Sequence, residues 1–275
     1  MLKFGLLGPL EVRDGDRVID IRRRKQRALL AALALEVGRA ISTDRLVEEL
    51  WGEHSPRTAK HALENYVSEL RKTLGREVIG TGPGGYVLEI DRDQVDVSRF
   101  ERLVAEARES ETGERAAKLR SALALFRGPP LADLGFEPFA PAAVARLEEL
   151  ELAAREGLVD AELELGRHAE VVAELEQTVA AHPYRERPRA QLMLALYRSG
   201  RQADALAAYQ GVRRALVDEL GIDPGEELQE LERAILRQDP SLRAPRREPE
   251  RTSAPASMVR GPARKTVTIV LAELA

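Results

Sequence analysis

The sequence predicts a mainly α-helical protein in which a small β-sheet, three helices and a β-hairpin precede a longer all-helical region. Hydrophobic residues make up 44% of the 275 residues but aromatic residues only 4%, so the core consists of Leu, Ala and Val, a mixture that favours helices. The spacing of apolar residues is helical along most of the chain and changes to a period of two around residues 78–90. Two similar segments begin at Gly166 and Gly200, and this offset of 34 residues is the period of tetratricopeptide (TPR) repeats.

The composition excludes several classes of protein. The chain has no cysteine, which excludes disulfide scaffolds, thiolate metal sites and thiol catalysis. No apolar stretch reaches the ~20 residues that span a bilayer, and the first residues do not read as a signal peptide, so we expect a cytoplasmic protein without a membrane partner. The net charge of −4 is unevenly distributed, because residues 1–95 carry +1, residues 96–240 carry −9 and residues 241–265 carry +5. The partners of each segment are therefore judged separately.

Short β-prone runs open the chain. Strands are expected at residues 4–8, 11–13 and 17–21, with a turn at Asp14-Gly15-Asp16, and together they predict a small antiparallel sheet. A sheet of this size is not stable alone, so we expect it to pack against the elements that follow.

Three helices and a hairpin are expected next. The first helix spans residues 24–35, with Gly38 as its stop, and the second spans residues 46–51, with caps at residues 42–44 and an end at Gly52. The third spans residues 55–74, with Ser55 as its cap and Pro56 at its first position. Strands at residues 78–79 and 86–90 then form a hairpin with a glycine-rich tip. This first domain is expected to end at residue 95.

Residues 96–238 predict helices throughout, with breaks at residues 112–113, 128–130, 183, 200 and 221–224. Leu175 and Tyr209 occupy equivalent positions in the two TPR-like copies. Two copies do not make a stable solenoid, so residues 96–166 are expected to supply further helical hairpins. Residues 239–264 are rich in Pro and Arg and predict a disordered linker. Residues 265–275 return to a β-prone apolar run, which we interpret as the start of an absent or truncated further domain.

The third helix carries the chemistry that points to function. Its apolar stripe comprises Ala59, Leu63, Tyr66, Val67, Leu70 and Leu74, and the polar residues on the opposite face are Arg57, His61, Glu64, Asn65, Ser68 and Lys72, flanked by Lys60 and Arg71. An α-helix fits the major groove of B-DNA, where Arg, Lys and Asn read base edges and Ser, Thr and Lys hold phosphates. The basic run Arg22-Arg23-Arg24-Lys25, ahead of the first helix, would add attraction for phosphate. Ordinary solvation of a surface helix produces a similar polar face.

Several runs of residues are similar to those of the Streptomyces antibiotic regulatory protein (SARP) family. They are Phe4-Gly5-Leu6-Leu7-Gly8-Pro9-Leu10, residues 39–42 and 50–52, the third helix from Ser55 to Arg71, the hairpin at residues 81–86, Asp96-Val97-Ser98-Arg99-Phe100, and residues 127–133. The resemblance covers residues 2–238, and the motifs occur in the family's order. It implies an OmpR-type winged helix-turn-helix DNA-binding domain at residues 1–95 and an all-helical, TPR-like bacterial transcriptional activation domain at residues 96–238.

The resemblance implies a nucleoid-associated transcriptional activator that binds direct repeats in promoters. Its expected partners are double-stranded DNA, the RNA polymerase holoenzyme and a second protomer, which would make it a homodimer on DNA. The third helix would be the recognition helix and residues 81–86 the wing. The expected DNA-binding residues are Arg24, Lys25, Arg57, Thr58, Lys60, His61, Glu64, Asn65, Ser68, Arg71, Lys72, Thr81, Gly84 and Tyr86. Glu64 and Glu69 stand where the family often has Gln or Arg, which leaves the base sequence read by this helix open.

No catalytic residue, metal or cofactor is expected. The glycines of the hairpin tip lack the following Lys-Ser/Thr of a phosphate-binding loop, and the four histidines (His54, His61, His168 and His182) show no ligand pairing. The chain is therefore not expected to be an enzyme.

Two other functions stay open. One is a helical-repeat scaffold whose winged helix binds protein instead of DNA, and the −9 charge of the helical region suits a basic protein partner. The other is the regulatory N-terminal part of a larger signalling protein, a cyclase or an NTPase. For this second function, residues 264–274 resemble the first strand of class III nucleotide cyclase domains, with Glu273 in place of the metal-binding Asp.

Overall fold

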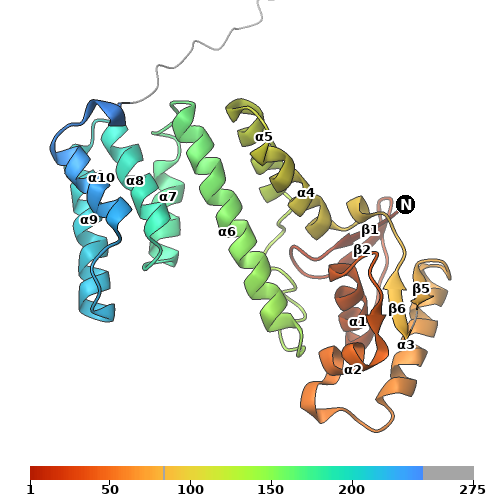
Figure 1. Ribbon diagram of the computed structural model, residues 1–275. Helices are drawn as coiled ribbons and strands as arrows, with labels where there is room; N and C mark the ends of the chain where they lie inside the picture. Colours follow the sequence, from red (N-terminus) through yellow and green to blue (C-terminus); the bar gives the residue numbers. More distant parts are fainter. Residues whose placement is uncertain (83, 244–275) are drawn as a thin grey trace, which may run out of the picture. The chain divides into compact units, whose positions relative to one another are not determined.

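The computed structural model describes residues 1–82 and 84–243, which belong to one compact unit (Figure 1). The expected further domain at residues 265–275 and most of the expected linker lie outside the described residues. Of the linker only residues 239–243 are described, and they include a 3₁₀ turn, η4 (Pro240–Leu242). Within the described part of the chain, no helix combines the length and the apolar character needed to cross a membrane.

A small antiparallel sheet opens the chain, as predicted. Its strands are β1 (Leu2–Gly5), β2 (Glu11–Asp14) and β3 (Arg17–Val18), in that order across the sheet. The first strand ends at Gly5, earlier than expected, and the third ends at Val18 instead of residue 21. The first strand ends where the Leu6 and Leu7 amides donate to the Asp96 carboxylate instead of to a neighbouring strand. Leu6, Leu7 and, after the third strand, Ile21 are buried.

The three expected helices follow as α1 (Arg24–Leu35), α2 (Thr43–Trp51) and α3 (Ala59–Leu74). Ser42 caps α2, because its hydroxyl oxygen accepts a hydrogen bond from the Arg45 amide at 3.2 Å. The prediction that the third helix begins at Ser55 is wrong. Residues 55–58 form a turn in which the Ala59 amide donates to the Pro56 carbonyl, and Thr58, at φ −92° and ψ 7°, has the conformation of a turn residue.

The predicted hairpin is present and gains a strand that the sequence did not reveal. Strands β5 (Ile79–Gly82) and β6 (Gly85–Leu88) pair with each other, and β4 (Ile41–Ser42) pairs with the other edge of β6. Gly85 is required there, because a Cβ atom at this position would collide with the Ile41 carbonyl oxygen. A strand of two residues has no periodic pattern, which explains why sequence analysis missed it.

Helices form the rest of the described chain: α4 (Asp96–Arg108), α5 (Thr112–Leu123), α6 (Ala140–Glu164), α7 (Val172–Ala181), α8 (Glu186–Arg198), α9 (Gln202–Ala215) and α10 (Glu226–Leu236). A π-helical turn, η3 (Leu216–Leu220), extends α9. The breaks predicted near residues 183, 200 and 221–224 are confirmed. The prediction at residues 112–113 is wrong, because Thr112 and Gly113 begin α5 and the break lies just before them.

The expected break at residues 128–130 is part of a longer non-helical segment, residues 124–139, which we name the strap. Its backbone amides bond to the N-terminal segment: Arg127 donates to the Leu7 carbonyl at 2.7 Å and Leu131 to the Leu6 carbonyl at 3.0 Å. Gly128 and Leu131 adopt positive φ angles, which a helix does not contain. The strap is therefore irregular, with local turns and two backbone hydrogen bonds to a distant part of the chain.

One hydrophobic core extends from Phe4 to Ala154 and includes residues of the N-terminal sheet, α1–α3, the strap and α4–α6. Leu131 and Leu134 of the strap are fully buried in it. The Asp96 carboxylate, at the start of α4, accepts hydrogen bonds from the Leu6 and Leu7 amides at 2.8–2.9 Å, and its burial raises its pKa. The first helices of the helical region and the N-terminal elements are thus packed as one body.

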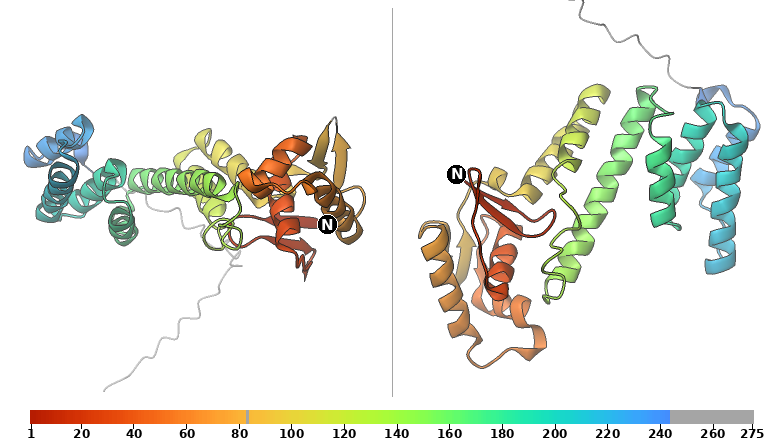
Figure 2. Two further views of the ribbon diagram at one scale, coloured as in Figure 1. Left: turned by 90° about the horizontal axis from the view of Figure 1, so that it is seen from below. Right: turned by 180° about the vertical axis from the view of Figure 1, so that it is seen from behind.

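A second core joins the end of α6 to α7–α10, and it contains the predicted repeat (Figure 2). Gly166 and Gly200 have φ angles of 75° and 78°. The amide of the next residue donates to the carbonyl five residues earlier in both copies, at 2.9 Å from Arg167 to Glu162 and from Arg201 to Leu196. Leu175 and Tyr209 are both buried in this core. The 34-residue repeat is therefore confirmed.

Candidate nucleic-acid interface

Helix α3 has one buried and one exposed face. Leu63, Val67 and Leu70 are buried against the core, as the predicted apolar stripe requires. Tyr66 is half-buried, and its ring stacks on that of Trp51 with the ring centroids 6.2 Å apart. The packing fixes the helix and turns its other side to solvent.

Most of the predicted DNA-binding residues lie exposed on that outer face or in the turn before it. They are Arg57, Thr58, Lys60, His61, Glu64, Asn65, Ser68 and Lys72. Within the described residues, the side chains of Arg57, Asn65 and Lys72 form no hydrogen bond or ion pair. Their donors are therefore available to a ligand. Asn is a residue type that reads adenine, whereas Arg and Lys bind either phosphate or guanine.

Two residues of the outer face form exposed ion pairs. The Lys60 Nζ atom lies 2.7 Å from an Asp44 carboxylate oxygen, and the His61 Nδ1 atom lies 3.5 Å from a Glu64 carboxylate oxygen. Exposed pairs of this kind contribute less than about 1 kcal/mol, so both can be exchanged for contacts with a ligand at little cost.

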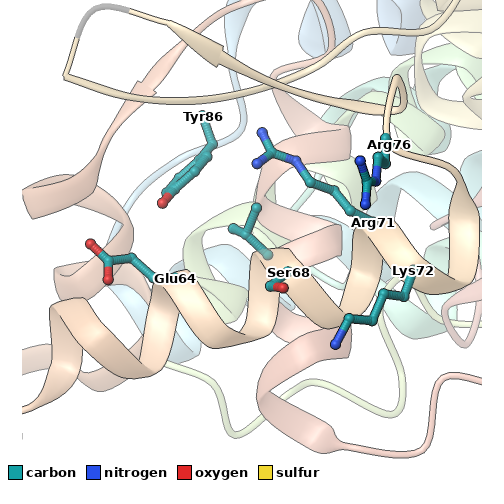
Figure 3. Close-up of a pocket in the computed structure, with 7 residues that line it drawn as sticks. Glu64, Ser68, Arg71, Lys72, Arg76 and Tyr86 are labelled. Atoms are coloured by element: carbon teal, nitrogen blue, oxygen red, sulfur yellow. The ribbon is translucent and has the colours of Figure 1, made fainter.

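Arg71 lies differently from the other basic residues of α3. Its half-buried side chain extends to the hairpin, where Nε donates to the Ile79 carbonyl and Nη2 donates to the Thr81 hydroxyl, both at 2.8 Å (Figure 3). Its guanidinium lies 5.9 Å from the centre of the Tyr86 ring. Lys72, the next residue, points away from the hairpin in the same view. Arg71 therefore links two parts of the candidate interface.

The outer face of α3 and the hairpin form one continuous groove. Its lining residues are Glu64, Val67, Ser68, Arg71, Lys72, Arg76 and Tyr86. Burial raises the pKa of the Tyr86 hydroxyl, and the negative charge of Glu64 raises it further, against the opposing effect of Arg71. Tyr86 is thus a neutral hydrogen-bonding group at neutral pH.

The tip of the hairpin is tied to the start of α2. The Gly84 carbonyl accepts hydrogen bonds from the Thr43 amide at 3.0 Å and from the Thr43 hydroxyl at 3.1 Å. Gly84 and Thr81 are exposed beside Pro83, which lies outside the described residues. The hairpin presents small side chains and backbone groups, which suit close approach to a nucleic-acid backbone.

The basic run at the start of α1, residues 22–25, is engaged in ion pairs. The Arg24 Nε atom lies 2.6 Å from one oxygen of Glu137 in the strap, and the Lys25 Nζ atom lies 2.8 Å from the other oxygen. Lys25 also donates to the Leu50 carbonyl. Glu137 is only 1% exposed, so both cations compensate a buried charge. The structure therefore places Arg24 and Lys25 at the strap, apart from the unpaired cations of α3.

Comparison with known proteins agrees with this arrangement. The family model "Bacterial transcriptional activator domain" matches residues 95–236, and "Transcriptional regulatory protein, C terminal" matches residues 19–88. Regulatory protein DnrI of Streptomyces peucetius is 37% identical over 256 residues, which cover 88% of this chain and 94% of DnrI. The chain belongs to the SARP family of transcriptional regulators.

Longer relatives match as well. Regulatory protein AfsR of Streptomyces griseus is 42% identical over 252 residues, which cover 90% of this SARP-family chain but 26% of AfsR. The chain therefore spans about a quarter of the length of AfsR. The solved structure of Mycobacterium tuberculosis EmbR in complex with a low affinity phosphopeptide has a TM-score of 0.83 and 39% identity, and it covers 87% of this chain and 66% of EmbR. The predicted fold, a winged helix-turn-helix domain followed by a helical TPR-like domain, is confirmed.

The two glutamates that depart from the SARP pattern have different surroundings. Glu69 points to α1, where its carboxylate accepts hydrogen bonds from Arg23 at 2.9 Å and from the Gln26 side chain. Glu64 is exposed and lines the groove. Only Glu64 therefore contributes negative charge to the groove itself.

Sequence analysis missed two residues of this interface. Arg76 is exposed, lines the groove and has no side-chain partner among the described residues. The sequence signal that could have identified Arg76 is a basic residue directly after Gly75, which ends the helix. Thr43 holds the hairpin tip, but its role depends on a contact 41 residues away in sequence, and no local pattern indicates it.

Proposed function

We propose that this chain is a sequence-specific DNA-binding transcriptional activator that binds direct repeats in promoters and recruits the RNA polymerase holoenzyme. Helix α3 lies in the major groove, and the hairpin at residues 79–88 follows the adjacent backbone or minor groove. The observation that carries the proposal is the exposed outer face of α3 and the turn before it, where Arg57, Asn65 and Lys72 lack partners among the described residues in a chain of the SARP family.

We divide the proposed DNA contacts by residue type and position. Asn65, Ser68 and Glu64 lie on the exposed face and are assigned to base edges. The residues assigned to phosphate or backbone contacts are Arg57, Thr58, Lys60, His61, Lys72, Arg76, Thr81, Gly84 and Tyr86. Arg24 and Lys25 are assigned to ion pairs with Glu137 of the strap, because a phosphate would have to compete with this buried carboxylate for them.

The helical region is proposed to bind protein. Residues 96–240 carry a net charge of −9, which opposes contact with DNA and favours a basic protein surface. Stacked TPR-like hairpins commonly present such binding surfaces. Two protomers would lie side by side on the direct repeats at the nucleoid in the cytoplasm, and no cofactor or catalytic step is part of this proposal.

Selection of bound DNA from a random pool, followed by sequencing of the bound fraction, tests the proposal. We expect enrichment of a pair of direct repeats spaced by about one helical turn, roughly 10 base pairs. Weak binding without enrichment, lost at physiological salt, would instead support the protein-binding scaffold. RNA polymerase recruitment is then measured by transcription from a promoter that carries the selected site.

The match with AfsR supports a second candidate, in which the same two domains work within a longer regulator. The observation is that the chain covers 26% of AfsR. Immunoblotting of cell extracts with an antibody against residues 1–243 distinguishes this candidate from a regulator of 275 residues. A longer regulator migrates well above 30.4 kDa.

A further inference from the structure

Arg71 supplies side-chain hydrogen bonds that link α3 to the hairpin. Two of its nitrogen atoms donate to β5, to the Ile79 carbonyl and the Thr81 hydroxyl at 2.8 Å each, and its guanidinium lies over the Tyr86 ring of β6 (Figure 3). Two of the five guanidinium N–H groups are used in this way, and the planar group is thereby held in one orientation against the hairpin. We propose that Arg71 is a positioning residue that sets the hairpin relative to α3, and that it does not itself contact DNA.

The opposite side of the hairpin is already fixed by other contacts. Strand β4 pairs with β6, and Thr43 binds the Gly84 carbonyl. Arg71 supplies side-chain hydrogen bonds from the α3 side, so polar contacts hold the hairpin from two elements. If the hairpin loosens, α3 and the hairpin no longer reach adjacent parts of the duplex with a fixed spacing. This inference rests on the proposed DNA-binding function and adds the role of one residue in it.

The sequence of the hairpin provides a way to separate positioning from direct contact. Residues 79–88 contain no Lys or Arg. Hairpin contacts with DNA therefore displace no counterions, and losing them weakens binding without changing its dependence on salt. A phosphate contact made by Arg71 itself would contribute about 0.9 to the slope of log affinity against log salt.

The experiment uses the selected DNA site and three variants of the full chain. Arg71→Met removes the donors but keeps aliphatic packing on Tyr86, and Thr81→Val removes the acceptor but keeps the charge of Arg71. Lys72→Met is the matched control, because it removes the neighbouring cation, which has no partner among the described residues. Thermal unfolding of each variant establishes that it is folded.

We expect Arg71→Met and Thr81→Val each to weaken binding about tenfold with an unchanged salt slope. Both remove the bond between Arg71 and Thr81, and Arg71→Met also removes the bond to the Ile79 carbonyl, so the loosened hairpin has to be ordered when DNA binds. The double variant is expected to bind no more weakly than the weaker single variant. Lys72→Met is expected to lower the slope by about 0.9. In the free protein, the backbone amides of the hairpin should exchange their hydrogens faster in both Arg71→Met and Thr81→Val.

The inference is overturned if Arg71→Met lowers the salt slope by about 0.9, as Lys72→Met is expected to do. It is also overturned if the effects of Arg71→Met and Thr81→Val on the binding free energy add in the double variant. Unchanged hydrogen exchange in the hairpin would overturn it as well. If the wild-type protein selects no DNA site, the proposed function fails, but the exchange measurement on the free protein still decides the positioning role.

Discussion

Two basic regions of the molecule look alike in the sequence and differ in the structure. In the basic run at the start of α1, Arg23 pairs with Glu69, and Arg24 and Lys25 both pair with Glu137. On and beside α3, Arg57 and Lys72 have no partner among the described residues. The availability of a cation is thus decided by carboxylates that lie 46 to more than 100 residues away in sequence.

The difference has an energetic reason. Glu137 is 1% exposed, and a buried carboxylate is strongly disfavoured unless cations compensate it. Arg24 and Lys25 are therefore needed where they are. The carboxylates that pair with residues of the outer side of α3, Asp44 and Glu64, are exposed, so they compete only weakly with a nucleic acid.

The largest effect is expected for Glu137→Gln, which removes the charge that holds the basic run. We expect the free energy of unfolding to fall by about 3 kcal/mol, the low end for a broken buried pair, because Arg24 is 57% exposed and regains water. Urea unfolding measures this change. Glu148→Gln, at an exposed position of α6, is the control and should change stability by less than about 0.5 kcal/mol. Equal stability of the two variants would mean that Glu137 does not hold the run.

The next largest effect is expected for Asn65→Ala on α3. If the Asn65 amide reads a base, binding to the selected site should weaken by about 1–3 kcal/mol, while binding to unrelated DNA stays the same. Titration of both DNAs by fluorescence anisotropy measures the two affinities. Equal losses on both would assign Asn65 to the backbone, and no loss on either would remove it from the interface.

A smaller effect is expected for Arg57→Ala, in the turn before α3. As a phosphate contact, Arg57 should contribute to all sequences alike, so the variant should bind specific and unrelated DNA more weakly by the same factor. The slope of log affinity against log salt should fall by about 0.9. Affinities measured at four or more salt concentrations give this slope. A loss confined to the selected site would show that Arg57 reads a base.

The contrast between the two regions also explains what the sequence could predict. Helix α1, the buried face of α3 and the 34-residue repeat depend on local periodicity and glycine positions, and all three are confirmed. The strap, the pairing of Lys25 with Glu137 and the hydrogen bonds of Arg71 to β5 depend on contacts between distant segments. A basic residue carries the same local signal whether a carboxylate of the same chain or a phosphate of a ligand neutralises it, so sequence analysis grouped Arg24 with Arg57.

The smallest effect is expected for Arg24→Ala, and it tests the comparison most directly. Lys25 remains to pair with Glu137, and the Arg24 side chain is more than half exposed, so stability should fall by no more than about 1 kcal/mol. For DNA binding, the salt slope should equal that of the wild type, because the guanidinium is committed to Glu137 and displaces no counterion from the duplex. The salt titration used for Arg57→Ala measures this slope, and the slopes of the two variants are then compared. A slope lowered by about 0.9 would show that Arg24 exchanges Glu137 for a phosphate on binding, and the two basic regions would then act on DNA in the same way.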